Sequence, residues 1–296
     1  MQLHVVGHTA TAVLRVLGDL FSKLSGDHGS LWFERLKLML QEKNPFAELK
    51  SAAIDQTQNW RAQLVREARK KLRRFSSAWA KQVTPPPAEW TEEFLTNAAM
   101  YNLRPVFFPA VTLDEKFLRR GYVKPGSWVY RQVVEGAVDR TVLTLKSGWA
   151  LADFSNGVDY TNGTQVLPRD PWAPLLTRLR TVLKVLGKYG DALDGSRFAI
   201  THDEWIQVVL AHMASALNIT RAKISLERMA EFNFIGNVYD AKRGKFDLWE
   251  WLEDELVGGA RLLTGCRDDG GIAAIASLEG SRRRDWITAR PLVRFF

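Results

Sequence analysis

Apolar residues recur at helical spacing through the first third of the chain. The spacing predicts an amphipathic helix over residues 11–24, a second over 31–41 and a long third over 46–80. None of the three helices carries a recognisable catalytic or ligand-binding motif. We therefore expect residues 1–83 to form a helical N-terminal region.

A run of prolines ends this pattern. Residues 84–87 read Thr-Pro-Pro-Pro, and three consecutive prolines cannot continue a helix and favour a stiff, extended chain. A short helix is expected next, from Trp90 to Asn102. The interpretation is a Pro-rich linker and short helix over residues 84–103, which separates the helical region from a domain over residues 104–296.

Short strands and helices alternate after the linker. Residues 104–112 are β-like, with prolines that suit the edge of a sheet, and residues 196–200 are a further strand candidate. Thr201 and Glu204 have the spacing of a capping box, which predicts a helix from there to about Leu217. Another helix is expected from Ser225 to about Phe234. The predicted fold class is α+β.

Composition suits a globular protein in a reducing compartment. Hydrophobic residues make up 46% and charged residues 25% of the 296 residues. The lone cysteine, Cys266, excludes an internal disulfide. The first residues lack a basic segment before their apolar stretch, and no run of about eighteen apolar residues exists. We expect a cytoplasmic protein without a membrane span.

The net charge of +8 leaves nucleic acid open as a partner. Part of the basic excess lies in a helical run, Arg66, Arg69, Lys70, Lys71, Arg73 and Arg74, and part in a run of arginines near the C-terminus. No aromatic platform for base stacking interleaves the helical run. A solvated helix face is therefore the favoured interpretation, and nucleic-acid binding is the alternative.

Motifs in a characteristic order fill the last hundred residues. They are Phe-Ala-Ile-Thr-His-Asp-Glu (198–204), Glu-Phe-Asn-Phe-Ile-Gly-Asn (231–237), Leu-Trp-Glu-Trp-Leu-Glu-Asp-Glu (248–255), Ala-Arg-Leu-Leu-Thr-Gly (260–265), Gly-Gly-Ile-Ala (270–273) and the closing Ala-Arg-Pro-Leu-Val-Arg-Phe-Phe (289–296). This order resembles the formylglycine-generating-enzyme type of C-type-lectin fold. Within that fold it resembles the variable proteins of bacterial or phage diversity-generating retroelements. The resemblance covers about residues 196–296, and more loosely the chain from Arg104.

The resemblance implies a C-type-lectin-like domain with a rigid scaffold. Trp249 and Trp251 alternate about Glu250, so both can face one side of a strand. We expect an ion pair from Arg290 to Glu250 or Glu253 to tie the last strand to these tryptophans. The scaffold residues implied are Glu231, Trp249, Glu250, Trp251, Gly270, Gly271 and Arg290.

The resemblance also implies a hypervariable ligand-binding face between the scaffold motifs. Ala276 to Trp286 shows neither helical nor strand periodicity, and three adjacent arginines cannot all point inward, so part of this stretch is an exposed loop. The candidate ligand-binding positions are Tyr239, Asp240, Arg243, Cys266, Arg267, Asp268, Asp269, Ala274, Ala276, Ser277, Leu278, Gly280, Ser281, Arg282, Arg283, Arg284, Asp285 and Trp286.

Catalytic signatures are missing from the sequence. Formylglycine-generating enzymes use a cysteine pair, whereas this chain has Cys266 alone, which we interpret as a variable or small core residue; a reactive thiol is the alternative. His202 and Asp203 follow a helix cap and are expected in solvent. The acidic residues from Glu250 to Glu255 suit ion pairs or a solvated face better than a cation site. No catalytic residue, metal site or cofactor is expected.

The sequence hypothesis is therefore a non-enzymatic binding protein. Its C-terminal face, diversified by a retroelement, would recognise a protein or other macromolecular ligand, with Arg and Trp as anchors. The alternatives are an enzyme related to formylglycine-generating oxidases and a nucleic-acid binder that uses the basic helix.

Overall fold

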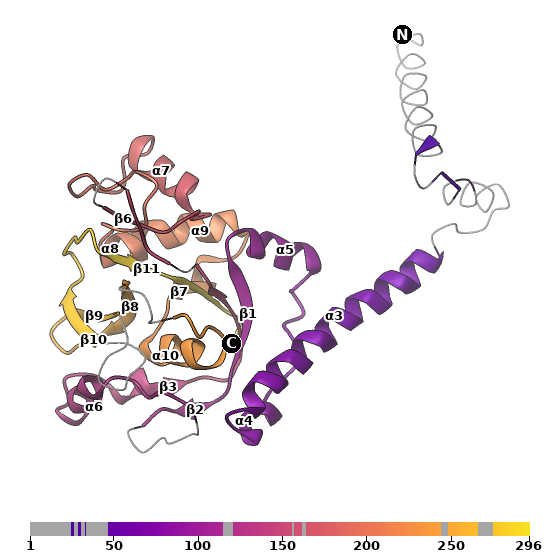
Figure 1. Cartoon of the computed structure of the whole chain (residues 1–296), viewed down its shortest axis with the longest axis horizontal. Coiled ribbons are helices and arrows are strands. Elements are labelled where there is room, and N and C mark those ends of the chain that lie inside the picture. Colours follow the sequence, from indigo (N-terminus) through magenta and orange to yellow (C-terminus); the bar gives the residue numbers. More distant parts are fainter. Residues whose placement is uncertain are drawn as a thin grey trace, which may run out of the picture. The chain divides into compact units, whose positions relative to one another are not determined.

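The computed structural model describes most of the chain after residue 46. The described residues are 25–26, 29–30, 33, 47–114, 121–155, 157–161, 164–243, 248–265 and 275–296, without the side chains of residues 47–59 and 275. The chain divides into two compact units, residues 1–60 and 61–296. The expected helices over 11–24 and 31–41 lie almost wholly outside the described residues. Everything below concerns the second unit (Figure 1).

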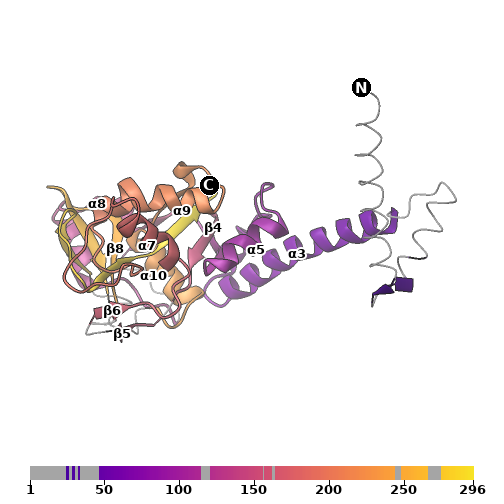
Figure 2. The same cartoon turned by 90° about the horizontal axis from the view of Figure 1, so that it is seen from above.

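Helices of several lengths surround the sheets of this unit. The described α-helices are α3 (Ala47–Arg73), α4 (Ser77–Lys81), α5 (Glu92–Met100), α6 (Ser127–Val134), α7 (Ala173–Thr181), α8 (His202–Glu204), α9 (Leu210–Ala216) and α10 (Met229–Val238). Short 3-10 helices are η1 (Arg140–Leu143) and η3 (Arg221–Lys223), and a π-helical segment, η2 (Trp205–Val209), joins α8 to α9. α8 and α9 follow one another along one side of the unit (Figure 2). No described helix is long and apolar enough to cross a membrane.

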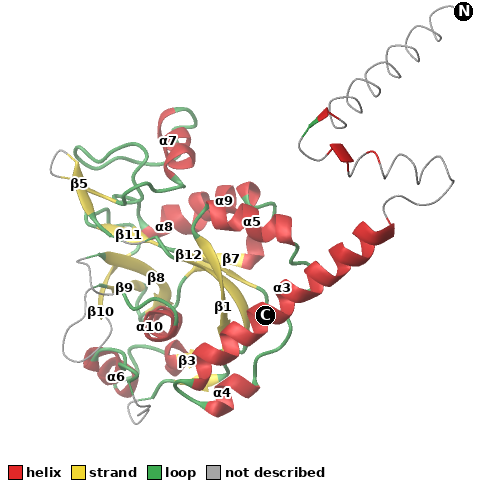
Figure 3. Ribbon diagram, turned by 45° about the vertical axis from the view of Figure 1, so that its right-hand side comes forward, coloured by secondary structure: helices red, strands yellow, loops and turns green. Residues whose placement is uncertain are grey.

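Two four-stranded sheets form the centre of the unit (Figure 3). The first has the order β1-β4-β12-β7 and is antiparallel; its strands are Leu103–Phe108, Gly148–Asp153, Pro291–Arg294 and Ile224–Leu226. The second has the order β10-β9-β8-β11, with strands Ile275–Glu279, Ala260–Thr264, Trp249–Glu255 and Ile287–Ala289. In it β11 runs parallel to β8, and the other pairs are antiparallel. Two small ribbons pair β2 (Val111–Thr112) with β3 (Thr144–Leu145) and β5 (Asp159–Thr161) with β6 (Thr164–Val166).

The C-terminal strands connect the two sheets. The chain leaves β11 in the second sheet, passes Arg290 and enters β12 in the first. Arg290 is buried, and its Nε lies 3.0 Å from Glu250 Oε2 in β8. The expected ion pair between Arg290 and the Trp-Glu-Trp strand is therefore confirmed.

The structure confirms a mixed α+β fold and several local expectations. Thr201 and Glu204 form the capping box, and the helical stretch after it runs to Ala216 with the π-helical segment inside it. The short helix after the prolines is α5. Pro105 lies in β1, which is an edge strand as expected.

Three local expectations were wrong. The single helix expected over residues 46–80 ends at Arg73, and a separate short helix, α4, begins at Ser77. Residues 196–200 form turns instead of a strand, because Ala199 has a left-handed backbone (φ 59°) that a strand cannot include. The helix expected from Ser225 begins at Met229 instead, since Ser225 lies in β7 and pairs with Leu292 of β12.

The proline run lies within the compact unit that begins at Arg61, and not between units as expected. Arg61 Nη1 donates to the carbonyls of Pro86 and Pro87 at 3.0 and 3.1 Å, and Trp149 Nε1 donates to the Thr84 carbonyl at 2.9 Å. Proline residues have a backbone carbonyl that accepts hydrogen bonds but no N–H that donates one. The carbonyls of an extended proline segment are therefore free to accept hydrogen bonds from side chains such as Arg61 and Trp149.

Candidate ligand-binding surface

The connection from β10 to β11 carries most of the described candidate ligand-binding residues. β10 is an edge strand that pairs with β9, and Ala276 to Glu279 lie in it, although no strand was expected there. A turn follows in which the Arg282 N–H donates to the Glu279 carbonyl at 3.0 Å. The chain then returns to the opposite edge of the sheet as β11.

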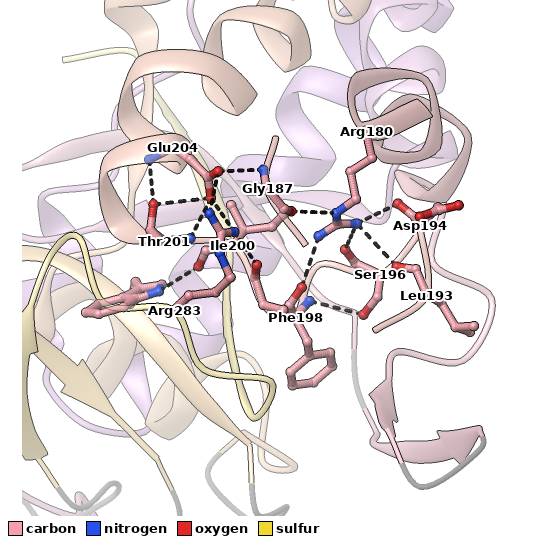
Figure 4. A network of polar contacts seen from close by, with 12 residues as sticks. Arg180, Gly187, Leu193, Asp194, Ser196, Phe198, Ile200, Thr201, Glu204 and Arg283 are labelled. Atoms are coloured by element: carbon pink, nitrogen blue, oxygen red, sulfur yellow. Dashed lines mark hydrogen bonds and ion pairs between the residues drawn. The ribbon is translucent and has the colours of Figure 1, made fainter. Parts of the chain in front are cut away.

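Arg283 fixes this connection to the capping box of α8 (Figure 4). Its guanidinium donates two hydrogen bonds of 2.7 Å to the two carboxylate oxygens of Glu204 and one of 2.6 Å to the Ala199 carbonyl. Burial raises the pKa of Glu204, but the hydrogen bonds from Arg283 and from the Gly187 N–H outweigh it and leave the pKa below its usual value. Arg283 is thus a structural anchor and not a free ligand-binding residue.

Backbone contacts hold the turn on either side of this anchor. The Ala199 N–H donates to the Arg284 carbonyl at 3.2 Å, and the Asp203 N–H donates to the Gly280 carbonyl at 3.3 Å. Gly280 is buried, and a Cβ there would lie 2.8 Å from Asp203 Oδ1, which is the end of a half-exposed side chain and can shift to make room. Gly280 therefore belongs to the framework through its buried position and its backbone carbonyl.

Trp286 closes the connection by packing on the sheet. Its ring meets Trp249 edge to face, with centroids 6.1 Å apart, yet 38% of its surface stays exposed. Trp249 in turn covers Gly265, where a Cβ would lie 2.7 Å from the indole ring. A half-exposed tryptophan on a fixed platform suits a binding anchor.

The remaining side chains of the connection face solvent to different degrees. Ser277, Ser281 and Arg282 are exposed, and Ala276, Leu278, Arg284 and Asp285 are partly buried. Arg282 Nε lies 3.0 Å from Glu279 Oε2, but both side chains stay more than half exposed. The expectation that at least part of the arginine run is exposed is confirmed by Arg282.

Three candidate positions before the Trp-Glu-Trp motif are not on an exposed face, and that expectation was wrong. Tyr239 exchanges hydrogen bonds of 3.0 Å with the backbone of Phe107. Asp240 is buried, and Arg243 is fully buried in an ion pair with Glu227 and donates to the Asp153 carbonyl at 2.8 Å. These side chains hold β1, β4 and α10 together.

Other candidate positions lie outside the described residues. They are Cys266, Arg267, Asp268, Asp269 and Ala274, together with the scaffold glycines Gly270 and Gly271. The other scaffold residues have partners in the core. Glu231 binds Arg294 at 2.6 and 2.8 Å, and Trp251 Nε1 donates to the Ile200 carbonyl at 3.0 Å.

Arg180 shapes the loop behind the Arg283 anchor, a role that the sequence did not reveal. Its buried guanidinium donates to five backbone carbonyls, at distances from 2.5 to 3.4 Å, and Figure 4 shows it at the centre of the loop; the acceptors are Gly187, Leu193, Asp194, Ser196 and Phe198. Burial lowers the pKa of Arg180 to about 10, so the side chain stays charged at neutral pH. One cation thus satisfies the carbonyls of a loop without regular structure.

Arg197 organises a second buried network that the sequence did not reveal. It donates to Asp153 at 2.5 Å, to both oxygens of Asp170 at 2.7 Å and to Ser155 at 3.1 Å. Burial raises the pKa of Asp153, but the nearby Arg197 and Arg290 outweigh it and hold the pKa below its usual value. Arg197 lies 44 and 27 positions from Asp153 and Asp170 in the sequence, so no local pattern indicated this pairing.

Each buried aspartate and glutamate among the described residues lies in an ion pair with an arginine. Burial raises the pKa of Glu227, and the charge of the adjacent Arg243 opposes this rise. No group of three His, Cys, Asp or Glu side chains that could hold a metal occurs among the described residues. His202 was expected in solvent but is buried, because the helix α8 turns its ring onto Trp251, with centroids 5.8 Å apart.

The basic run on α3 is partly used within the fold. Arg69 Nη2 donates to the Val83 carbonyl at 3.2 Å, and Lys71 Nζ lies 4.9 Å over the Tyr239 ring. Burial lowers the pKa of Lys71, and Arg104 and Arg74 contribute in the same direction. Arg66, Lys70, Arg73 and Arg74 are exposed, as expected for a solvated helix face.

Comparisons of the chain with family models, with curated proteins and with solved structures gave no match. The mixed α+β architecture therefore rests on the structure itself.

Proposed function

We propose that this chain is a ligand-binding protein without catalytic activity, and that its C-terminal surface is diversified by a retroelement to recognise varied macromolecular targets, proteins above all. The proposal places this surface on a C-type-lectin-like scaffold, as the order of the motifs implies. The surface comprises the exposed side chains of residues 276–286, here called the display surface.

The observation that carries the proposal is the contrast between adjacent residues of this connection. Arg282 is exposed, whereas Arg283 is bound by Glu204 and Ala199; Ser281 is exposed, whereas Gly280 is buried against Asp203. A diversified surface needs positions that accept any side chain next to positions that hold the backbone still. A fixed backbone also limits the entropy lost on binding.

A stability comparison of adjacent arginines tests this division. Arg283→Met leaves Glu204 and the Ala199 carbonyl without their donor and should lower the free energy of unfolding by about 1–3 kcal/mol. Arg282→Met, the matched control, should change it by less than about 0.5 kcal/mol. Both are measured by chemical denaturation of the full chain.

A wider scan of the same segment extends the test. Display of every single substitution at Ser277, Gly280, Ser281, Arg282 and Arg283, sorted by protease resistance, should show broad tolerance at the three exposed positions, tolerance of small side chains only at buried Gly280, and intolerance at Arg283. Equal tolerance at Arg282 and Arg283 would contradict the proposed display surface.

A further inference from the structure

Apolar side chains gather in solvent on the loop that follows α7. Val182, Leu183, Val185, Tyr189 and Leu193 are all exposed, and Val182 reaches 70% exposure. We call residues 182–193 the apolar loop. Exposed apolar side chains scattered singly are ordinary, but five within twelve residues are not.

Hydrogen bonds from Arg180 and to Glu204 hold the backbone of the apolar loop. Arg180 binds the carbonyls of Gly187 and Leu193, and Glu204 accepts the Gly187 N–H at 2.7 Å. The Val185 N–H donates to the Leu179 carbonyl at 3.0 Å, and Leu186 and Ala192 are buried. These contacts fix the backbone of the loop, while Val182, Leu183, Val185, Tyr189 and Leu193 stay exposed on it.

Positive charges alternate with these side chains. The exposed cations in this part of the chain are Arg178 in α7 and Lys184 and Lys188 in the apolar loop, and the loop also carries one exposed acid, Asp191, near its end. Lys188 has a partner, Asp194 at 3.4 Å, but both side chains are about half exposed. Tyr189 adds an aromatic side chain with a polar tip, the type that favours the boundary between water and lipid.

We propose that the apolar loop binds the surface of an anionic membrane, by placing Val182, Leu183 and Val185 among the acyl chains and Lys184 and Lys188 among the headgroup phosphates. Short apolar side chains flanked by cations suit this surface, because the apolar part gains from burial and the cations gain from the negative leaflet. This interaction is separate from ligand binding by the display surface and would hold the protein at a membrane without a spanning helix.

Sedimentation with lipid vesicles tests the proposal on the full chain. The wild type should sediment with vesicles of phosphatidylglycerol mixed with phosphatidylcholine, more strongly at low salt, and much less with phosphatidylcholine alone. The double variant Leu183→Asp/Val185→Asp should lower the partition coefficient at least about tenfold. Lys184→Gln/Lys188→Gln should lower it roughly fivefold for each lysine.

The matched control places the same charges on exposed valines elsewhere. Val134 and Val257 are 85% and 78% exposed, and Val134→Asp/Val257→Asp should bind the vesicles as the wild type does. The lysine variant keeps every apolar side chain, so it reports on binding even if the aspartates disturb the loop. The proposal would be overturned if the wild type did not bind anionic vesicles, or if the loop variants bound them as well as the control does. In the first case the apolar loop would instead be a candidate surface for a protein partner.

Discussion

Replacing Arg197 by methionine should lower the free energy of unfolding by about 3–5 kcal/mol. The guanidinium is fully buried and is the partner of both Asp153 and Asp170, at 2.5 and 2.7 Å. Methionine fills a similar space but removes the guanidinium that binds both carboxylates, and Arg290 then remains near Asp153. Breaking a buried pair costs far more than the pair itself contributes, because one charge remains desolvated and uncompensated.

Urea denaturation of the two proteins at neutral pH gives this difference directly. Arg282→Met is the control, since it removes an equally large cation whose side chain is 57% exposed and whose pair with Glu279 is solvated. If Arg197→Met lost no more stability than Arg282→Met, the buried network would not be a structural centre of the fold.

Acidification should destabilise the protein through His202, by about 2–3 kcal/mol at pH 4.5. Burial lowers the pKa of His202 to about 4, with Arg261 acting in the same direction and Asp203 opposing. Both ring nitrogens are buried, and Asp203 Oδ1 lies 3.8 Å from Nδ1, beyond hydrogen-bond distance, so a proton on the folded ring is poorly solvated. The unfolded chain takes up this proton near the usual pKa of 6.5. The stability contributed by neutral His202 is therefore complete above pH 6.5 and is lost as the pH falls towards 4.

His202→Phe isolates this contribution, because phenylalanine keeps an aromatic ring against Trp251 and cannot be protonated. The stability difference between wild type and variant should shrink or reverse between pH 7 and pH 4.5. Burial raises the pKa of Glu227 and raises that of Asp254 to about 6, so protonation of these two carboxylates favours the folded state as the pH falls. This effect is the same in wild type and variant and cancels in the difference between them. Parallel stability curves for the two proteins over this range would show that the His202 ring is not held neutral.

Local sequence signals predicted local structure well. The capping box of Thr201 and Glu204 depends on residues three apart, and the short helix after the prolines needed no distant contact. Helix propensity failed around Ser225, where pairing with Leu292 of the last strand places the residue in a sheet. That contact joins segments 67 positions apart, and no local pattern reports it.

The candidate surface was predicted only in part, because the burial of its residues also depends on contacts that are distant in the sequence. Motif order pointed to the connection before Ile287, and the structure places Ser277, Ser281, Arg282 and Trp286 in solvent there. Sequence alone could not separate Arg282 from Arg283, since the difference depends on Glu204, 79 residues away. Arg243 was predicted to be exposed, because arginines usually are. It is buried instead, because its ion pair with Glu227 compensates the charge.

Sequencing the DNA around the coding region will show whether exposed positions of the display surface vary while the anchors beside them stay fixed. We expect a neighbouring reverse transcriptase gene and a near-copy of the segment that encodes the C-terminus. In the variable proteins that the sequence resembles, template adenines are the bases that are altered. Mismatches at adenines of the copy should therefore fall in codons for exposed residues such as Ser277, Ser281 and Arg282, and should spare Gly280 and Arg283. A region without such a copy, or variation concentrated in the anchor codons, would overturn the proposed diversification.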